Sequence, residues 1–417
     1  MSRGKVSLNG THHKIIRLGL TGAILFLLLV SLFGCNNTTP TPEPVTITFV
    51  HHDGEADYYD TLVQRFNEDY PHITVRLQSA WTADADVFVD LPYTLGQRLA
   101  QGELLSLDPF IEQDESFDLA DFYPGAVSVF TREGKTWAVP AGVNPMVMFY
   151  NQDLFDQYGV PYPKVEWTWD EFLNAALAIR DPDADVFGYV APPQPFPFDV
   201  LLFIHQHGGR IFDDLQSPTH TTFDDPLTIE AVEWYAALIN EHNVAPTRDQ
   251  TRRLFGTGAG GIYRGVLRGR AGMWIGWFSD RGGLTWPVEW DMRWGMVPVP
   301  RDAQSVTGAT VEGFFISAQT GHPDACWHWI DFLSQQVPAS LMPANRSVAE
   351  SAAYEGQVGQ EVAAVGQLSM ENAILVSPDQ AEFESTLEVF FKALDDVVNG
   401  RYTPAEAMHW AQRESQR

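Results

Sequence analysis

The part of the chain that follows residue 44 is the first whose side chains could form a core, and strand and helix patterns alternate along it. VTITFVHH alternates apolar and polar residues, which predicts a strand. The stretch YYDTLVQRFNEDYP then places Tyr59, Leu62, Val63 and Phe66 at helical spacing, with Pro71 just beyond the helix end. ITVRL and ADVFVD predict two more strands, and LGQRLAQG predicts a helix that ends at a glycine. This order favours an α/β lobe built on a parallel sheet.

Signals of both kinds continue to the end of the chain. KTWAVPAGVNPMVMFYNQDLF predicts a long extended stretch that leads into a helix, and EWTWDEFLNAALAI predicts a helix with a capping box made by Thr168 and Glu171. Strands are predicted at GRAGMWIGW, WGMVPVP and GATVEGFFISAQT, and helices at TIEAVEWYAALINEH, HPDACWHWIDFLSQQ and most of residues 382–413. A chain of 417 residues with these elements predicts two domains or lobes.

The N-terminal segment is of a different kind. Four basic residues precede an uncharged, mostly apolar run over residues 18–34, which is typical of a secretory signal. The run ends in LFGC, where a small residue precedes Cys35. This ending resembles a bacterial lipobox, so residues 1–34 are predicted to be a lipoprotein signal peptide and the Cys35 thiol to carry lipid. An uncleaved membrane helix and ordinary secretion are the alternatives.

The next stretch, residues 35–44, is predicted to be a flexible Thr/Pro-rich tether. NNTTPTPEP offers no side chain for a core, so it should not fold by itself. We therefore expect the folded body to be lipid-anchored at the extracellular face of the cytoplasmic membrane, or to lie in the periplasm.

Composition limits both the partners and the cross-links of the mature chain. Without residues 1–34, 22 Lys and Arg face 54 Asp and Glu, a formal charge of −32. Such a surface repels nucleic acid, whose phosphates need basic partners. With Cys35 lipidated, Cys326 has no partner for an intramolecular disulfide, and its helical context predicts a core thiol. The 13 Trp residues suggest that some serve a ligand surface.

Several long segments follow one another in an order that resembles a known family. They include GELLSLDPFI, KTWAVPAGVNPMVMFYNQDLF, WTWDEFLNAA, GGRIFDD, GRAGMWIGW, WGMVPVP, FFISAQTGHPDACWHWIDFL and PANRSVA. Their order is similar to that of the extracellular solute-binding proteins of ATP-driven importers, especially the carbohydrate-binding class typified by maltose-binding protein. The resemblance covers about residues 45–348 well and the C-terminal part loosely.

This resemblance implies an α/β, two-lobed periplasmic-binding-protein-like fold of type II, whose lobes are joined by a multi-strand hinge and close around a ligand. The chain would cross between lobes near Pro140–Asn144, near Val297–Pro300 and at the end of the DFLSQQ helix. The expected lobes are residues 45–141 plus 300–335, and residues 142–299 plus 336–417.

The resemblance also implies a ligand site of aromatic faces and paired polar groups. Trp277 follows Gly276 in GMWIGW, where the family places an aromatic platform. Trp274 is a second candidate, although strand alternation could equally put it in the core. Asn144 occupies a hinge position that contacts the ligand in relatives, with a turn role before Pro145 as the alternative.

Further candidates follow predicted strands. Asp90 ends ADVFVD, and ligands of α/β proteins bind at the carboxyl ends of strands. Its neighbour Tyr93 could stack on a ligand, and Trp81 could cover the cleft or lie in a surface loop. Glu312 stands where relatives have consecutive glycines, so it would either place a carboxylate in the cleft or block the usual approach of the sugar.

The remaining candidates come from two loops. Phe196, Phe198 and Asp199 lie in a Pro-rich stretch where relatives contact the ligand, with core packing open for at least one phenylalanine. Arg346 in PANRSVA resembles a position near the cleft mouth, with a surface salt bridge as the alternative.

The function implied by the resemblance is capture of a sugar or oligosaccharide in the inter-lobe cleft and its delivery to the permease subunits of an ABC importer. The protein would be a monomer that performs no chemistry on the ligand, with no catalytic residue and no cofactor. Two alternatives stay open. The same fold could bind a polyamine, an iron complex or a peptide, and the acidic candidates Asp90 and Glu312 would suit a cation. A glycoside hydrolase would need two carboxylates that flank a sugar bond.

Metal and phosphate sites find little support in the sequence. His51-His52 and His205-x-His207 have no third ligand at a recognisable spacing. GTGAGG lacks the flanking strand and helix of a phosphate-binding loop. We expect no metal site.

Overall fold

The computed structural model of the protein describes residues 1, 4, 43–82, 84–191, 198–214, 218–256, 260–375 and 384–416. Residues 45–417 form one unit, and residues 1–44 form another. Cys35, the predicted signal peptide and most of the predicted tether lie outside the described residues, so they stay predictions. Within the described ranges, no helix has both the length and the apolar character needed to cross a bilayer.

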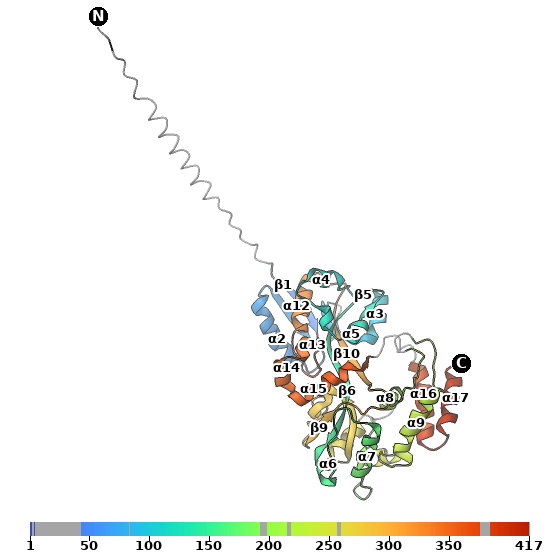
Figure 1. Ribbon diagram of the computed structural model, residues 1–417. Coiled ribbons are helices and arrows are strands. Elements are labelled where there is room, and N and C mark those ends of the chain that lie inside the picture. Colours follow the sequence, from blue (N-terminus) through green and yellow to red (C-terminus); the bar gives the residue numbers. More distant parts are fainter. Residues whose placement is uncertain are drawn as a thin grey trace. The chain divides into compact units, whose positions relative to one another are not determined.

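Three parallel strands begin the sheet (Figure 1). β1 (Val45–Val50) lies between β2 (Ile73–Gln78) and β3 (Val87–Asp90) and is parallel to both. Helix α2 (Ala56–Asp69) connects β1 to β2 and buries Tyr59, Leu62 and Phe66, whereas Val63, the fourth residue of the predicted apolar pattern, is only partly buried. The α/β lobe with a parallel sheet is therefore confirmed.

One long strand connects this part of the sheet to the rest. The first half of β6 (Val139–Asn151) pairs with β10 (Thr307–Ile316), which in turn pairs with β3. The second half of β6 pairs with β8 (Ala271–Trp277) on one edge and β9 (Trp294–Val297) on the other. β7 (Phe187–Tyr189) follows β8. The sheet order is β2-β1-β3-β10-β6-β8-β7, so β6 and β10 carry the chain from one half to the other.

The other elements surround these two halves. β11 (Ala373–Leu375) pairs with β10, and β4 (Thr131–Arg132) pairs with β5 (Lys135–Thr136). The short 3-10 helices are η1 (Pro92–Thr94), η2 (Leu119–Asp121) and η3 (Phe278–Gly283). The other helices are α3 (Leu95–Gln101), α4 (Asp108–Gln113), α5 (Pro124–Ser128), α6 (Gln152–Tyr158), α7 (Trp169–Ile179), α8 (Phe198–His207), α9 (Pro226–Asn240), α10 (Arg248–Leu254), α11 (Gly260–Leu267), α12 (Pro323–Ser334), α13 (Arg346–Ala349), α14 (Ala352–Val358), α15 (Gln360–Glu371), α16 (Glu384–Val398) and α17 (Pro404–Ser415).

Buried side chains form two clusters, of which the first extends over both halves of the sheet and the second lies on the second half. In the first, the rings of Phe49 and Trp329 meet edge to face at 5.7 Å between centroids. In the second, Phe172 and Tyr189 do the same at 5.2 Å. Burying large aromatic side chains of this kind contributes about 2–3 kcal/mol each. The stability of the fold therefore comes from packing on both halves.

Two local predictions are confirmed. Thr168 caps α7 in a reciprocal capping box with Glu171. Cys326 is fully buried in α12, and this burial raises the pKa of its thiol to about 12. It is therefore a core thiol of low reactivity.

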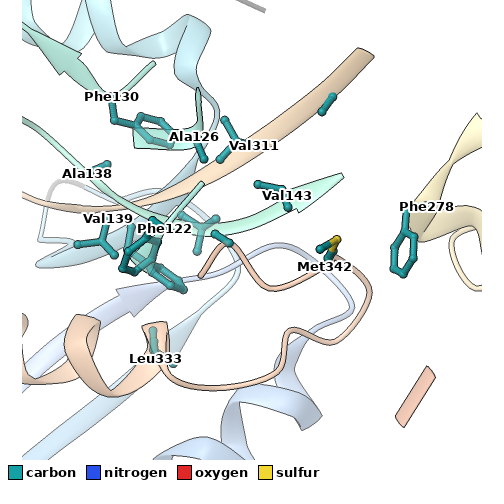
Figure 2. Close-up of a cluster of buried hydrophobic side chains, with 14 of the residues drawn as sticks. Phe122, Ala126, Phe130, Ala138, Val139, Val143, Phe278, Val311, Leu333 and Met342 are labelled. Carbon is teal, nitrogen blue, oxygen red and sulfur yellow. The ribbon is translucent and has the colours of Figure 1, made fainter. Parts of the chain in front are cut away.

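The crossing strands have an apolar face of their own. Val143 of β6 pairs with Val311 of β10 on one edge and with Met342 on the other. Figure 2 shows Met342 beside Val143 and close to Phe278 of η3. Through Met342, the segment that follows α12 therefore contacts both the crossing strands and the start of η3.

The C-terminal segment, residues 336–417, contacts two different parts of the fold, although we predicted that all of it belongs to the second lobe. The Tyr123 amide donates to the Ala344 carbonyl at 3.0 Å, and α15 contacts both β6 and β10. By contrast, α16 and α17 pack on α9. Residues before β11 therefore lie against the crossing strands and the loop before α5, whereas residues 384–415 belong with α9. The lobe boundaries stay a prediction.

Candidate ligand-binding site

The register of the sheet places four of the predicted ligand residues on neighbouring strands: Asp90 on β3, Glu312 on β10, Asn144 on β6 and Trp277 on β8. We call the line that joins them across the sheet the path. Directly paired residues lie on the same face of a sheet, and residues two apart on a strand do too. The side chains of Thr310, Glu312 and Asn144 therefore share one face, and burial along β10 alternates accordingly. The pairs along the path are Asp90–Gly313, Glu312–Gly142, Thr310–Asn144 and Trp277–Met146.

A cluster of charged side chains lies at the β3 end of this path, next to the carboxyl end of β1. His52 Nε2 lies 3.3 Å from Glu312 Oε2. The hydrogen bond with Glu312 raises the pKa of His52, helped by the charges of Glu312, Glu55 and Asp90 and opposed by burial. Burial and the charge of Glu312 raise the pKa of Glu55. Several carboxylates thus share this small region with one imidazole.

His52 and Glu55 were not predicted as ligand residues. They follow the carboxyl end of β1, just as Asp90 follows the carboxyl end of β3. The strand-end argument that singled out Asp90 would also have found them. In the sequence, His52 stood out only as part of the His51-His52 pair, which lacks a third metal ligand at a recognisable spacing.

Asp90 is held by an arginine of the chain itself. Arg98 donates from Nε and Nη2 to Asp90 Oδ2 at 2.8 and 2.6 Å, and from Nη1 to Glu103 Oε2 at 3.0 Å. The Arg98 guanidinium also lies 4.4 Å from the Trp81 ring centroid and 4.6 Å from that of Phe88. Asp90 therefore already has a cationic partner, and through Arg98 it orients the Trp81 ring.

Two aromatic side chains stand exposed beside this ion pair. Trp81 is 46% exposed and Tyr93 is 64% exposed. Both follow the carboxyl ends of parallel strands, as expected for residues that could meet a ligand.

On the second half of the sheet, Trp277 ends β8 and is partly buried. Its amide donates to Asp280 Oδ2 at 2.9 Å. Asn144 Nδ2 donates to Ser279 Oγ at 3.0 Å, and the Ser279 amide donates to Asn144 Oδ1 at 3.0 Å. Asn144 and Trp277 therefore meet at one turn, residues 277–280. Both ends of the Asn144 amide are used inside the protein, and because Asn144 lies within β6 the alternative of a turn before Pro145 is wrong.

Two predicted ligand residues lie in the core. Trp274 is fully buried, with its ring 5.8 Å from that of Phe149 in a stacked arrangement. Asp199 is also fully buried in α8, where Tyr189 Oη donates to its carboxylate at 2.6 Å and Tyr235 Oη at 3.4 Å. Burial raises the pKa of Asp199 to about 6. Neither side chain is accessible to a ligand in this structure.

The other predicted residues lie apart from the path. Phe196 and the side chain of Phe198 are outside the described residues. Arg346 is exposed at the start of α13, with its guanidinium 5.6 Å from the Tyr123 ring centroid. It lines a surface pocket together with Gln367 and Tyr123.

The histidine motifs form no metal site in the part of the chain that the structure describes, where no group of three or more His, Cys, Asp and Glu could hold an ion. His205 and His207 lie in α8, and residues two apart on a helix do not share a face. His207 instead bonds to Asp302 and Glu230.

Comparisons with known proteins agree with this architecture. A family model described as bacterial extracellular solute-binding protein matches residues 52–336. A lipoprotein of Streptomyces antibioticus is 26% identical over 351 residues, which is 76% of this chain and 72% of that protein.

Two solved structures resemble the fold closely. An ABC substrate-binding protein of Listeria monocytogenes in complex with cycloalternan has a TM-score of 0.71 at 22% identity, covering 90% of this chain and 98% of that chain. The cyclic alpha-maltosyl-1,6-maltose binding protein of Arthrobacter globiformis has a TM-score of 0.72 at 20% identity, covering 89% of this chain and 97% of that chain. The predicted fold, that of the type II periplasmic binding proteins, is confirmed.

Proposed function

Because the chain belongs to the bacterial extracellular solute-binding protein family, we propose that it captures a sugar or oligosaccharide between its lobes and delivers it to the permease subunits of an ABC importer. One observation carries the proposal. An aromatic residue, Trp277, ends β8 on the same path as the polar face of Thr310, Glu312 and Asn144. Sugars need both an aromatic face for the apolar side of the ring and paired polar groups for the hydroxyls.

The two solved structures support the ligand class. One contains cycloalternan, and the name of the other states that it binds a cyclic maltosyl oligosaccharide. We propose a ligand of the same class here, bound without chemistry by a monomeric protein. Lobe closure would bury the ligand, so its affinity would include the free energy of closing.

A lipid anchor on Cys35 completes the proposal. The similar Streptomyces protein is called a lipoprotein, and the LFGC ending predicts the same processing here. A tethered receptor would stay near its permease at the extracellular face of the membrane. Mass spectrometry of the protein from the membrane fraction tests this: a lipid-modified N-terminus at Cys35 is expected, and an unprocessed Met1 would contradict it.

Thermal unfolding with a ligand panel tests the ligand class. An oligosaccharide at 100 times its dissociation constant should stabilise the protein by about 2.7 kcal/mol, since it binds only the folded state. The panel would contain linear and cyclic glucosyl oligosaccharides and other neutral sugars. If no sugar raised the melting temperature, the proposal would fail.

A cationic ligand is the second candidate, because Glu55, Asp90 and Glu312 all act on His52. Spermidine belongs in the same panel as its probe. A shift with spermidine and none with any sugar would favour this candidate. Release of reducing ends from a bound oligosaccharide would instead indicate a hydrolase.

A further inference from the structure

The turn after β8 contains a carboxylate that is surrounded by neutral donors. Asp280 Oδ2 accepts the Trp277 amide at 2.9 Å, and Oδ1 accepts Thr285 Oγ1 at 2.5 Å. Burial raises the pKa of Asp280, which these bonds and the Trp286 indole oppose, and no cation among the described residues contributes. A half-buried carboxylate without a counter-ion is costly unless hydrogen bonds satisfy it, so these bonds matter to the turn.

The chain makes room for this carboxylate next to Trp277. A Cβ atom at Gly276 would lie 3.0 Å from Asp280 Oδ2 and 3.1 Å from the Phe149 ring. Both approaches are tighter than ordinary contact. A glycine before Trp277 therefore lets the carboxylate reach the Trp277 amide.

The rest of the turn is held from other sides. Asn144 binds both the amide and the hydroxyl of Ser279. Phe278 is fully buried near Met342, and a Cβ atom at Gly366 would lie 2.9 Å from its ring. With Phe278 and Ser279 fixed in this way, Asp280 supplies the remaining bond, the one to Trp277 itself.

We propose that Asp280 is a positioning residue that fixes Trp277 as the stacking platform for the ligand, an inference that rests on the proposed function. The carboxylate accepts the Trp277 amide and so fixes the backbone from which the indole projects. A platform that is already ordered does not lose freedom when ligand binds, and this strengthens binding. Without the bond, the indole would have to be ordered by the ligand.

A double-mutant cycle tests whether Asp280 acts through Trp277. Calorimetric titration with an oligosaccharide that binds would compare Asp280→Ala, Trp277→Ala and the double variant. Asp280→Ala removes the acceptor and should weaken binding about tenfold alone and less than about twofold in the Trp277→Ala background, because coupled residues are not additive. Equal losses in both backgrounds would mean that Asp280 meets the ligand directly and would overturn the proposal. No loss in the Trp277 protein would overturn it as well.

A matched control separates the two bonds of the carboxylate. Thr285→Val removes the hydroxyl donor and leaves the bond to the Trp277 amide. It should weaken binding less than about threefold, since net hydrogen-bond contributions are modest. A loss as large as that of Asp280→Ala would show that the carboxylate serves the turn in general and not Trp277.

A second readout needs no ligand. Fluorine NMR of protein labelled with 5-fluorotryptophan would follow the Trp277 resonance, identified by its absence from Trp277→Phe. Asp280→Ala should shift or broaden this resonance and leave that of Trp410 in α17 unchanged. An unchanged Trp277 resonance would overturn the proposal, even if no sugar were found to bind and the proposed function failed separately.

Gly276→Ala guards against a misfolded Asp280→Ala protein. It keeps the carboxylate but places a methyl group against Asp280 Oδ2. The same change in the Trp277 resonance is expected, whereas an unchanged resonance would contradict the positioning role.

Discussion

The two sides of the candidate site use different chemistry. On the side of β1 and β3, the groups are charged: His52, Glu55 and Asp90 lie at or near strand ends, and Glu312 lies within β10. On the side of β8, Trp277 stands on a turn held by hydrogen bonds to the Asp280 carboxylate and the Asn144 amide. One side could thus sense charge and pH, while the other offers an aromatic face.

Most of the charge on the side of β1 and β3 is paired within the protein. Arg98 already neutralises Asp90, and His52 lies against Glu312. The charge of His52 also acts on Glu55, but burial and the charge of Glu312 outweigh it and raise the pKa of Glu55. The charged side is therefore largely satisfied within the protein. We expect the aromatic side to supply more of the affinity and the charged side to select among ligands.

Replacing Trp277 should have the largest effect. Trp277→Ala should weaken oligosaccharide binding by about 1–3 kcal/mol, because the ligand loses an apolar face. Titration calorimetry measures the change. Trp410→Ala, which truncates another partly buried tryptophan, is the matched control and should bind normally. An unchanged dissociation constant for folded Trp277→Ala would reject the platform.

Removing Arg98 should affect stability more than binding. Arg98→Gln leaves the half-buried Asp90 carboxylate without its cation, which should cost about 1–3 kcal/mol in the free energy of unfolding. Denaturant unfolding at neutral pH measures it. Asp90→Asn in the same protein should restore part of the loss. Arg252→Gln, from an exposed helix pair with Asp249, is the control; a loss as large there would contradict the account.

Asn144→Ala should act on the turn. It removes both bonds to Ser279, which should lower the free energy of unfolding by about 1–2 kcal/mol. Binding should weaken as well, because the Trp277 turn loses one of its supports. Denaturant unfolding and calorimetry on one sample measure both. If binding fell while stability stayed the same, Asn144 would contact the ligand directly.

Glu312→Gln should give the smallest effect. Glu312 raises the pKa of His52 in the folded protein, so the stability from this pair is fully present below about pH 6.5, the ordinary His value. It is lost as pH rises through the raised pKa. The variant should lower the pKa of His52 in an NMR titration and flatten this pH dependence. An unchanged His52 titration would mean that the two groups do not interact.

Much of the fold followed from local patterns. The alternation in residues 45–110, the capping box at Thr168 and the core position of Cys326 all depend on neighbours in sequence. The burial of Trp274 was within reach too. Residues 274 and 277 are an odd number apart on a strand, so they face opposite sides.

Other features of the site depend on contacts that sequence spacing does not reveal. Arg98 reaches back to Asp90 across η1 and α3, and nothing in LGQRLAQ marks it as a partner. Asp199 was predicted in a Pro-rich stretch but lies in α8, where Tyr189 of β7 and Tyr235 of α9 donate to its carboxylate. The division of the segment after α12 likewise follows from long-range packing.

A crystal structure with the oligosaccharide that most raises the melting temperature tests the central claim most directly. We expect a sugar ring stacked on Trp277, with its hydroxyls near Glu312 and the carboxyl end of β1. The two lobes should be closed around the sugar. A sugar bound away from Trp277, or bound without contact to both halves of the sheet, would contradict it.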